Sequence, residues 1–320
     1  MKIFVDDINK ITLEVFTIGY TEKGESQVVL IYDNVNSNCI LSFVIDCYSS
    51  SEANLTIDIL NQYKISHLDY FIWTHTDEDH SIGINNIIDT FCDKKTQFYL
   101  PEGVAGNEND FINYNQEIKD CFDKINSFNK GNNYNVHSLT SVVGGHTQVL
   151  KMFFVDSSTS KEFVLEILGI APISALIRRR WEAGEVKKKN DLSIATIFKV
   201  GEIGLLFSGD IENQTINQIP DFYFEGLSYI KTPHHTSNSS TKLIDKIEKV
   251  FNDEKIPSAV STTYKTHNLP NTDLIEQYKK YVTTFSSTGD GNTGYGYIKT
   301  VFEIIDKEYT EELFGDAIIH

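Results

Sequence analysis

The stretch "FIWTHTDEDHSIGI", residues 71–84, decides the fold, because an apolar run ends there in a dense cluster of charged residues. The segment "HTDEDH", residues 75–80, holds two histidines and three acids. After it, apolar residues recur at the spacing of a helix with one buried face: Ile84, Ile87, Ile88 and Phe91. The charges are therefore predicted to lie in a loop between a buried strand and a helix, where open α/β sheets place their ligands.

The charged loop contains residue types that bind divalent metal ions. Imidazole suits zinc, iron or manganese, and carboxylate suits harder ions. Alternation along an extended loop sends His75, Asp77 and Asp79 to one side, while His80 can turn back from the following helix. The alternative is a solvated acidic loop with two incidental histidines, the usual fate of a charge run. The apolar strand before the loop and the amphipathic helix after it favour a metal site.

The rest of the chain alternates strand-like and helix-like segments without a long linker. This pattern predicts one α/β domain made of two sheets sandwiched by helices. β-branched and aromatic residues predict strands at 11–20, 26–34, 39–47, 67–73, 148–155, 163–170, 192–200, 202–210, 227–235, 258–264 and 295–304. Helical spacing of apolar residues predicts helices within 52–65, 84–91, 241–251 and 272–282.

Charge and composition limit the partners of the 320-residue chain. Lys and Arg number 28 against 45 Asp and Glu, so the net charge of −17 disfavours extended, nonspecific nucleic-acid binding. A small anionic substrate, or a polymer end drawn to a metal site, remains compatible with it. The four cysteines show no CxxC spacing and the N-terminus lacks a secretion signal, so we expect a reduced, cytoplasmic protein. The most apolar segment, 163–177, is too short to span a bilayer, which predicts no membrane anchor.

Several motifs together resemble a known fold family. "THTDEDH" resembles the HxHxDH signature of the metallo-β-lactamase fold, with Asp77 in place of the second histidine. This HxDxDH version resembles the branch that contains the hydrolase domain of the DNA-uptake competence protein ComEC. Further motifs of that branch follow in the same order: "VIDC" (44–47), "NDLSIATIF" (190–198), "LLFSGD" (205–210), "IKTPHHTSNS" (230–239) and "THNLP" (266–270).

The resemblance implies a four-layer αββα sandwich that forms a single domain over residues 1–320. Its core would run from about residue 12 to residue 304, with residues 305–320 as a C-terminal extension. Two departures from the family pattern concern the histidine loops. Thr236 replaces the usual glycine, and Asn268 with Leu269 interrupts the His-Pro pair, so we expect the loop around His267 to be shaped differently.

The resemblance also implies a site for two divalent ions, zinc or manganese. His75 and Asp77 would hold one ion, Asp79 and His80 the other, and Asp210 would bridge them. Three histidines are candidates both for the remaining ligand and for a proton donor, and the sequence leaves these roles open: His234, His235 and His267. His146, in "VGGHTQ", resembles the third-ligand histidine of the wider fold, and whether it is a ligand or an ordinary loop histidine is also open.

A site of this kind implies a metal-dependent hydrolase. Two ions would lower the pKa of a bridging water and supply hydroxide at neutral pH. Asp79 or Asp210 could orient the hydroxide, and His235 or His267 could protonate the leaving group. ComEC-like relatives, tRNase Z and RNase J point to phosphodiester cleavage, so a two-metal phosphodiesterase or nuclease is expected. The alternatives are a hydrolase of a small ester, thioester or lactam, and a non-catalytic binding or effector protein that retains the fold.

A basic segment supplies candidate substrate-binding residues. In "RRRWEAGEVKKKN" (178–190), basic side chains could bind phosphates and an aromatic ring could stack on a base: Arg178, Arg179, Arg180, Lys187, Lys188, Lys189 and Trp181. The alternative is a solvated insertion tip. Asn190 and Ser193 follow it as further candidates, and Lys231 is either a phosphate ligand or a structural surface lysine. The partners expected are a nucleic acid or nucleotide and a protein of a defence or nucleic-acid processing system, with the oligomeric state open.

Overall fold

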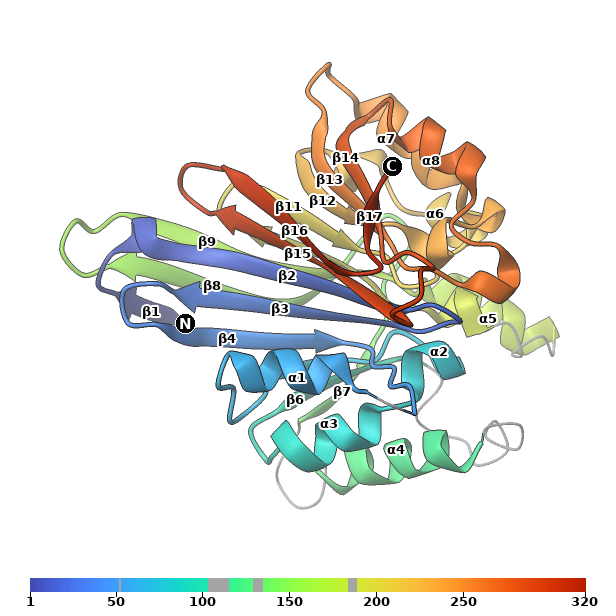
Figure 1. Cartoon of the computed structure of the whole chain (residues 1–320), viewed down its shortest axis with the longest axis horizontal. Helices are drawn as coiled ribbons and strands as arrows, with labels where there is room; N and C mark the ends of the chain where they lie inside the picture. The colour runs from blue at the N-terminus through green and yellow to red at the C-terminus, as the bar shows by residue number, and fades with distance from the viewer. Residues whose placement is uncertain (52, 103–114, 129–134, 184–188) are drawn as a thin grey trace.

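Two β-sheets lie face to face in this protein, and helices cover their outer faces (Figure 1). The computed structural model describes residues 1–51, 53–102, 115–128, 135–183 and 189–320. Across the first, nine-stranded sheet the order is β1 (Lys2–Val5), β8 (Thr147–Asp156), β9 (Glu162–Ala171), β10 (Ala195–Val200), β11 (Ile203–Phe207), β12 (Leu227–Lys231), β13 (Ile256–Ser261), β14 (Val282–Ser287) and β17 (Ile318–Ile319).

The second sheet has eight strands. Their order is β16 (Tyr309–Gly315), β15 (Tyr295–Glu303), β2 (Ile11–Tyr20), β3 (Glu25–Asp33), β4 (Asn38–Ile45), β5 (Tyr70–Ile72), β6 (Gln97–Pro101) and β7 (Val136–Leu139). Each sheet combines an antiparallel part with a parallel part. Strands β11 to β14 are parallel neighbours in one sheet, and β4 to β7 are parallel neighbours in the other. The carboxyl ends of each parallel set therefore share one edge.

Helices form the two outer layers. The eight-stranded sheet is covered by α1 (Leu55–Gln62), α3 (Ile84–Phe91) and α4 (Gln116–Ser127), and the nine-stranded sheet by α6 (Asn213–Ile216), α7 (Lys242–Val250) and α8 (Thr272–Tyr278). Two further helices lie at one end of the sandwich: α2 (Glu78–Ser81) and α5 (Ser174–Ala183) (Figure 1).

The central strands are buried on both faces, which explains their nearly continuous apolar sequences. In β3, Val29 and Ile31 pack into the core between the sheets, whereas Val28 and Leu30 pack under the helices. Side chains of both sheets share the inter-sheet core. The predicted four-layer αββα architecture is confirmed. Among the described residues, no helix is long and apolar enough to cross a membrane.

The structure adds elements that the sequence patterns did not predict. The C-terminal extension, residues 305–320, contributes β16 and β17, an edge strand in each sheet. Residues 178–183, expected in a loop, form the second half of α5, whose Leu176 and Ile177 are buried. Strands β1, β6, β7 and β14 were also missed. Apart from these, every predicted strand and helix overlaps an observed one, with ends that differ by a few residues.

Candidate metal centre

The side chains of the candidate centre follow the carboxyl ends of parallel strands from both sheets. Asp46 and the loop with His75 follow β4 and β5, whereas Asp210 and the pair His234–His235 follow β11 and β12. The hydrogen bond from Ile194 N to Thr74 O, 2.9 Å, joins the two sheets beside the loop. The packing of the sheets therefore brings together residues that are more than a hundred positions apart in the chain.

Backbone strain accompanies this placement. His234, His235 and Thr236 have φ angles of 49°, 52° and 61°, the left-handed region that costs about 1–3 kcal/mol for each non-glycine residue. The Thr236 hydroxyl hydrogen-bonds Ser261 Oγ at 2.8 Å and Thr232 Oγ1 at 2.8 Å, which ties the turn to the core. These bonds explain how a threonine is accommodated at a position where the family that the sequence resembles has glycine.

Gly209 shows the same close fit on the facing loop. Its φ is 49°, and a Cβ there would lie 2.5 Å from Ser193 Oγ and 2.8 Å from Ile194 O. Only glycine fits between these atoms. The "SGD" turn therefore places Asp210 at the meeting point of the two sheets.

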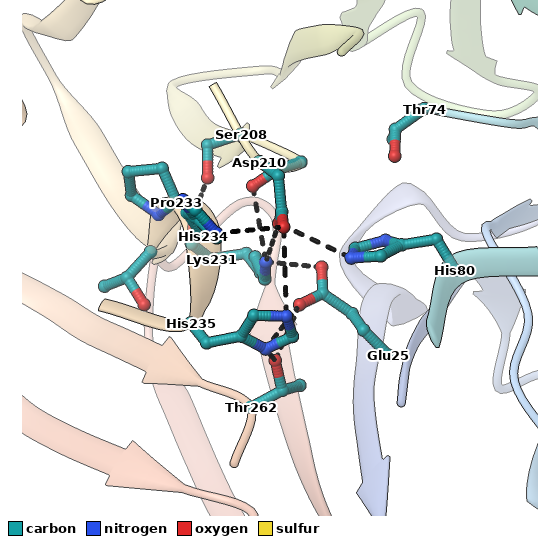
Figure 2. Close-up of polar contacts among 12 residues, drawn as sticks. Glu25, Thr74, His80, Ser208, Asp210, Lys231, Pro233, His234, His235 and Thr262 are labelled. Atoms are coloured by element: carbon teal, nitrogen blue, oxygen red, sulfur yellow. Dashed lines mark hydrogen bonds and ion pairs between the residues drawn. The ribbon is translucent and has the colours of Figure 1, made fainter. Parts of the chain in front are cut away.

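Four imidazole rings converge on the carboxylate of Asp210 (Figure 2 shows three of them). The Nε2 atoms of four histidines lie 3.5–3.9 Å from its oxygens: His80 at 3.5 Å, His75 and His235 at 3.8 Å, and His234 at 3.9 Å. Two more aspartates complete the cluster. Asp77 Oδ2 lies 3.5 Å from His75 Nε2, and Asp79 Oδ2 lies 3.2 Å from His235 Nε2 and 3.8 Å from His80 Nε2.

Hydrogen bonds behind the rings fix which ring nitrogen faces the cluster. Asp46 Oδ2 accepts a bond from His80 Nδ1 at 2.7 Å and one from the Thr74 hydroxyl at 2.5 Å. Because Thr74 donates its only proton to Asp46, its oxygen accepts from His75 Nδ1 at 3.0 Å. Both rings therefore carry the proton on Nδ1 and present Nε2 toward Asp210, the arrangement typical of metal-bound histidine.

Several buried atoms of the cluster have no hydrogen-bond partner among the described residues. They are His75 Nε2, His80 Nε2 and Asp210 Oδ1. Since buried polar atoms are almost always paired, unpaired imidazole nitrogens that face carboxylate oxygens fit cations held between them. The donor set, imidazole with carboxylate, is one that zinc and manganese accept. The residues present therefore fit divalent metal.

The carboxylates and histidines of the cluster shift each other's pKa values. Burial would raise the pKa of the Asp79 carboxyl, but His80 and His235 lower this pKa to about 2. Burial would likewise lower the pKa of His80, but the nearby carboxylates, first Asp210 and then Asp79, raise it well above its usual value. The carboxylates are thus anionic, and the cluster attracts positive charge. Metal binding at such a site displaces protons from the histidines.

A buried ion pair lies behind the cluster. Glu25 and Lys231 are both fully buried, and Lys231 Nζ contacts Glu25 Oε1. Burial raises the pKa of Glu25, but the charge of Lys231 outweighs it, so the pKa falls below its usual value. Lys231 was predicted to be a phosphate ligand or a surface lysine; its ammonium is enclosed and paired, which argues against both roles. Glu25 was missed, since nothing in a strand sequence shows that its first residue will face a site.

Atoms of Glu25 and Asp46 lie close enough to the histidines to be counted among candidate ligands. Their hydrogen bonds argue against that role. Glu25 is engaged by Lys231 and by the Thr262 hydroxyl at 2.6 Å, and Asp46 accepts from Thr74 N at 2.6 Å as well as from its hydroxyl and His80. Both acids therefore orient ligands from behind.

A polar cavity of about 780 Å³ opens in front of the cluster. His267 and Tyr264 form part of its wall, with ring centroids 4.5 Å apart, and Tyr264 packs edge-on against His235 at 5.3 Å. His267 is exposed and stands outside the converging Nε2 atoms. The remaining lining residues described are Lys23, Asp77, Glu78, Asp79, Asp210, His234, His235, Ser237, Asn238, Asn268, Leu269 and Asn271.

Other predicted site residues lie elsewhere. His146 is exposed and its Nδ1 lies 2.6 Å from Tyr223 Oη; within the described chain no contact joins it to the cluster, which argues against a ligand role. Ser193 is fully buried and accepts a bond from Asp210 N at 3.0 Å, so it positions Asp210 and does not face substrate. Asn190 does reach the site, with Nδ2 3.5 Å from His234 Nε2.

The basic segment is only partly described. Arg178 and Arg179 are exposed on α5. The side chains of Arg180, Trp181 and Lys189, and residues 184–188 with Lys187 and Lys188, lie outside the described residues. Their roles in phosphate binding and base stacking stay predictions.

The fold and the cluster together define a four-layer α/β protein with a site suited to divalent metal. No protein-family model matches the chain, and no curated protein matches it. The chain does match solved structures of the metallo-β-lactamase fold. The chain is similar to a diphosphatase from the PhnP family (13% identity, covering 87% of this chain and 96% of that one, TM-score 0.39) and to the short form of human tRNase Z (11%, 84% and 88%, 0.39).

A third similar structure is a metallo-β-lactamase from Hirschia baltica, with 11% identity, coverage of 62% of this chain and 68% of that one, and a TM-score of 0.30. Similarity at this level describes only the arrangement of the chain and gives no information about activity or substrate. The finer resemblance to the ComEC hydrolase domain stays a prediction.

Proposed function

We propose that this protein is a metal-dependent hydrolase that holds two divalent ions around Asp210 and cleaves phosphodiesters. The observation that carries the proposal is the convergence of four Nε2 atoms on one carboxylate, with Asp77 and Asp79 on either side. His75 with Asp77 would hold one ion. Asp79, His80 and His235 would hold the other, since Asp79 Oδ2 lies within 3.8 Å of both Nε2 atoms.

Two ions bound there would lower the pKa of a water molecule and stabilise charge on the attacking and leaving oxygens of a phosphodiester. Asp79 and Asp210 supply the carboxylate oxygens that orient the attacking group. His267 is exposed at the cavity wall, where it can give a proton to the leaving oxygen. Its ring packs against Tyr264, which limits its orientation.

The cavity lining supports a polar, compact substrate. Leu269 is the only aliphatic side chain, and Lys23 the only lysine or arginine, among the described lining residues. Such a wall offers no apolar slot for an acyl chain. The net charge of −17 argues in the same direction, because it disfavours a long polyanion but not a nucleotide or the end of a strand.

The test is hydrolysis of bis(p-nitrophenyl) phosphate and of labelled single- and double-stranded DNA and RNA. Protein stripped of metal by a chelator is assayed alone and after addition of zinc or manganese. We expect metal-dependent cleavage that falls by about 100-fold or more in Asp79→Ala, which loses a ligand. Asp58→Ala is the control, because this aspartate is exposed on α1 and is not among the residues that line the cavity, so the variant should retain most activity.

Other outcomes would reject the proposal in different ways. Phosphodiesters left intact by metal-loaded protein, together with turnover of p-nitrophenyl acetate, a thioester or a lactam, would indicate the small-ester alternative. Protein that binds no metal and keeps full stability would indicate a binding or effector protein.

A further inference from the structure

The ion pair between Glu25 and Lys231 is a fully buried charged contact beside the candidate centre. Glu25 begins β3 in one sheet and Lys231 ends β12 in the other, and both side chains are fully buried. Lys231 Nζ also lies 3.4 Å from Gly209 O and 3.9 Å from Asp210 Oδ1. Because desolvation offsets most of the attraction within a buried pair, stability alone does not account for one here.

A hydrogen-bond chain runs from this pair to His235 (Figure 2). The Thr262 hydroxyl, just after β13, donates to Glu25 Oε2 at 2.6 Å. On its other side, Thr262 Oγ1 lies 2.8 Å from His235 Nδ1. Three strands of the two sheets therefore contribute to the orientation of one imidazole.

The direction of each bond in the chain follows from the number of protons. Glu25, paired with an ammonium, is a carboxylate and can only accept. Thr262 has a single hydroxyl proton, which goes to Glu25, so its oxygen must accept from His235 Nδ1. The ring then carries a proton on Nδ1, so Nε2, which donates to Asp79 Oδ2 at 3.2 Å, is the nitrogen that would bind an ion once its own proton is displaced.

We infer that Lys231, Glu25 and Thr262 are positioning residues that hold His235 as a metal ligand and prevent it from acting as the proton donor. This inference rests on the metal-binding part of the proposed function. It separates roles that the sequence left open, because no such chain lies behind His267 among the described residues, and His267 faces the cavity. The proton-donor role thus falls to His267.

The test is Thr262→Val, which keeps the shape of the side chain and removes the hydroxyl. Zinc binding to metal-free protein is measured by calorimetry, and the ring nitrogens of His235 are observed by ¹⁵N NMR in the zinc-loaded protein. We expect one of two zinc ions to bind 10- to 100-fold more weakly in the variant, the range typical for partners behind a ligand. Thr262→Ser, which restores the hydroxyl, should return wild-type affinity.

Thr300→Val is the matched control. Thr300, in β15, is a fully buried threonine like Thr262, and within the described chain its hydroxyl has no hydrogen-bond partner. Its zinc affinity should stay within twofold of wild type. In the wild-type spectrum, Nδ1 of His235 should carry the proton and Nε2 the zinc.

Unchanged zinc affinity in Thr262→Val would overturn the inference, as would a proton on Nε2 of His235 or protein that binds no zinc. These readouts need no hydrolysis. If zinc binds as expected and every phosphodiester survives, the proposed activity fails while the positioning role stands.

Discussion

At the scale of single residues, His80 shows which parts of the site its sequence reveals. The "HTDEDH" loop predicted its role as a ligand, and its Nε2 does face Asp210 and Asp79. Its Nδ1 bond to Asp46 depends on the pairing of β4 with β5, which no local pattern shows. The contact between Glu25 and Thr262 spans 237 positions, so it could not be predicted without the packing of the sheets.

The buried pair gives a prediction at this scale. Lys231→Met should lower the free energy of unfolding by about 3–5 kcal/mol, because it leaves the Glu25 carboxylate buried without a counter-charge. The double variant Glu25→Gln/Lys231→Met should recover most of this loss. Urea unfolding of the single and double variants measures both effects as a double-mutant cycle. A single variant as stable as wild type would mean that Glu25 finds another partner.

At the scale of elements, apolar periodicity predicted most strands and helices, because the central strands are buried on both faces and each helix is buried on one. Helix α3 was predicted from Ile84 to Phe91 and has those bounds. Helix α5 was not, because its run of arginines resembles a solvated loop and, of its described side chains, only Leu176 and Ile177 are buried. Strands β6 and β7 are short, and their sequences lack the alternation that identifies an isolated strand.

Helix α3 provides the prediction for this scale. Ile87→Ala should lower the free energy of unfolding by about 2–5 kcal/mol, because Ile87 is fully buried under the sheet and its truncation leaves a cavity. Asn86→Ala, one position away on the exposed face, should change it by less than about 0.5 kcal/mol. Equal effects from both changes, measured by urea unfolding, would place the helix in a different rotation on the sheet.

At the scale of the whole molecule, the two sheets share one core, and the C-terminal residues add an edge strand to each sheet. Residues 305–320 were expected to be an extension, yet β16 pairs with β15 and β17 with β14. The Glu311 carboxylate of β16 accepts a bond from Ser258 at 2.8 Å and another from Ser286, both in the other sheet. These strands were unpredictable because they are polar or very short, and only their pairing makes them strands.

The four cysteines test the packing of the whole chain. All are free thiols, and burial raises the pKa of each, Cys39, Cys47, Cys92 and Cys121, to about 12. At pH 8 the folded protein should therefore show almost no thiolate and react with Ellman's reagent very slowly. Denaturant should release four equivalents at once. A cysteine thiol that reacts rapidly in the folded protein would contradict the burial that the structure gives it.

The most direct test of the two-ion centre is calorimetric titration of metal-free protein with manganese or zinc. We predict two equivalents per chain for wild type, and weakened binding of both ions, by more than about 100-fold, in Asp210→Asn, which keeps the shape of the bridging side chain but removes its charge. One equivalent or none in wild type, or two unchanged equivalents in Asp210→Asn, would contradict a centre built around Asp210.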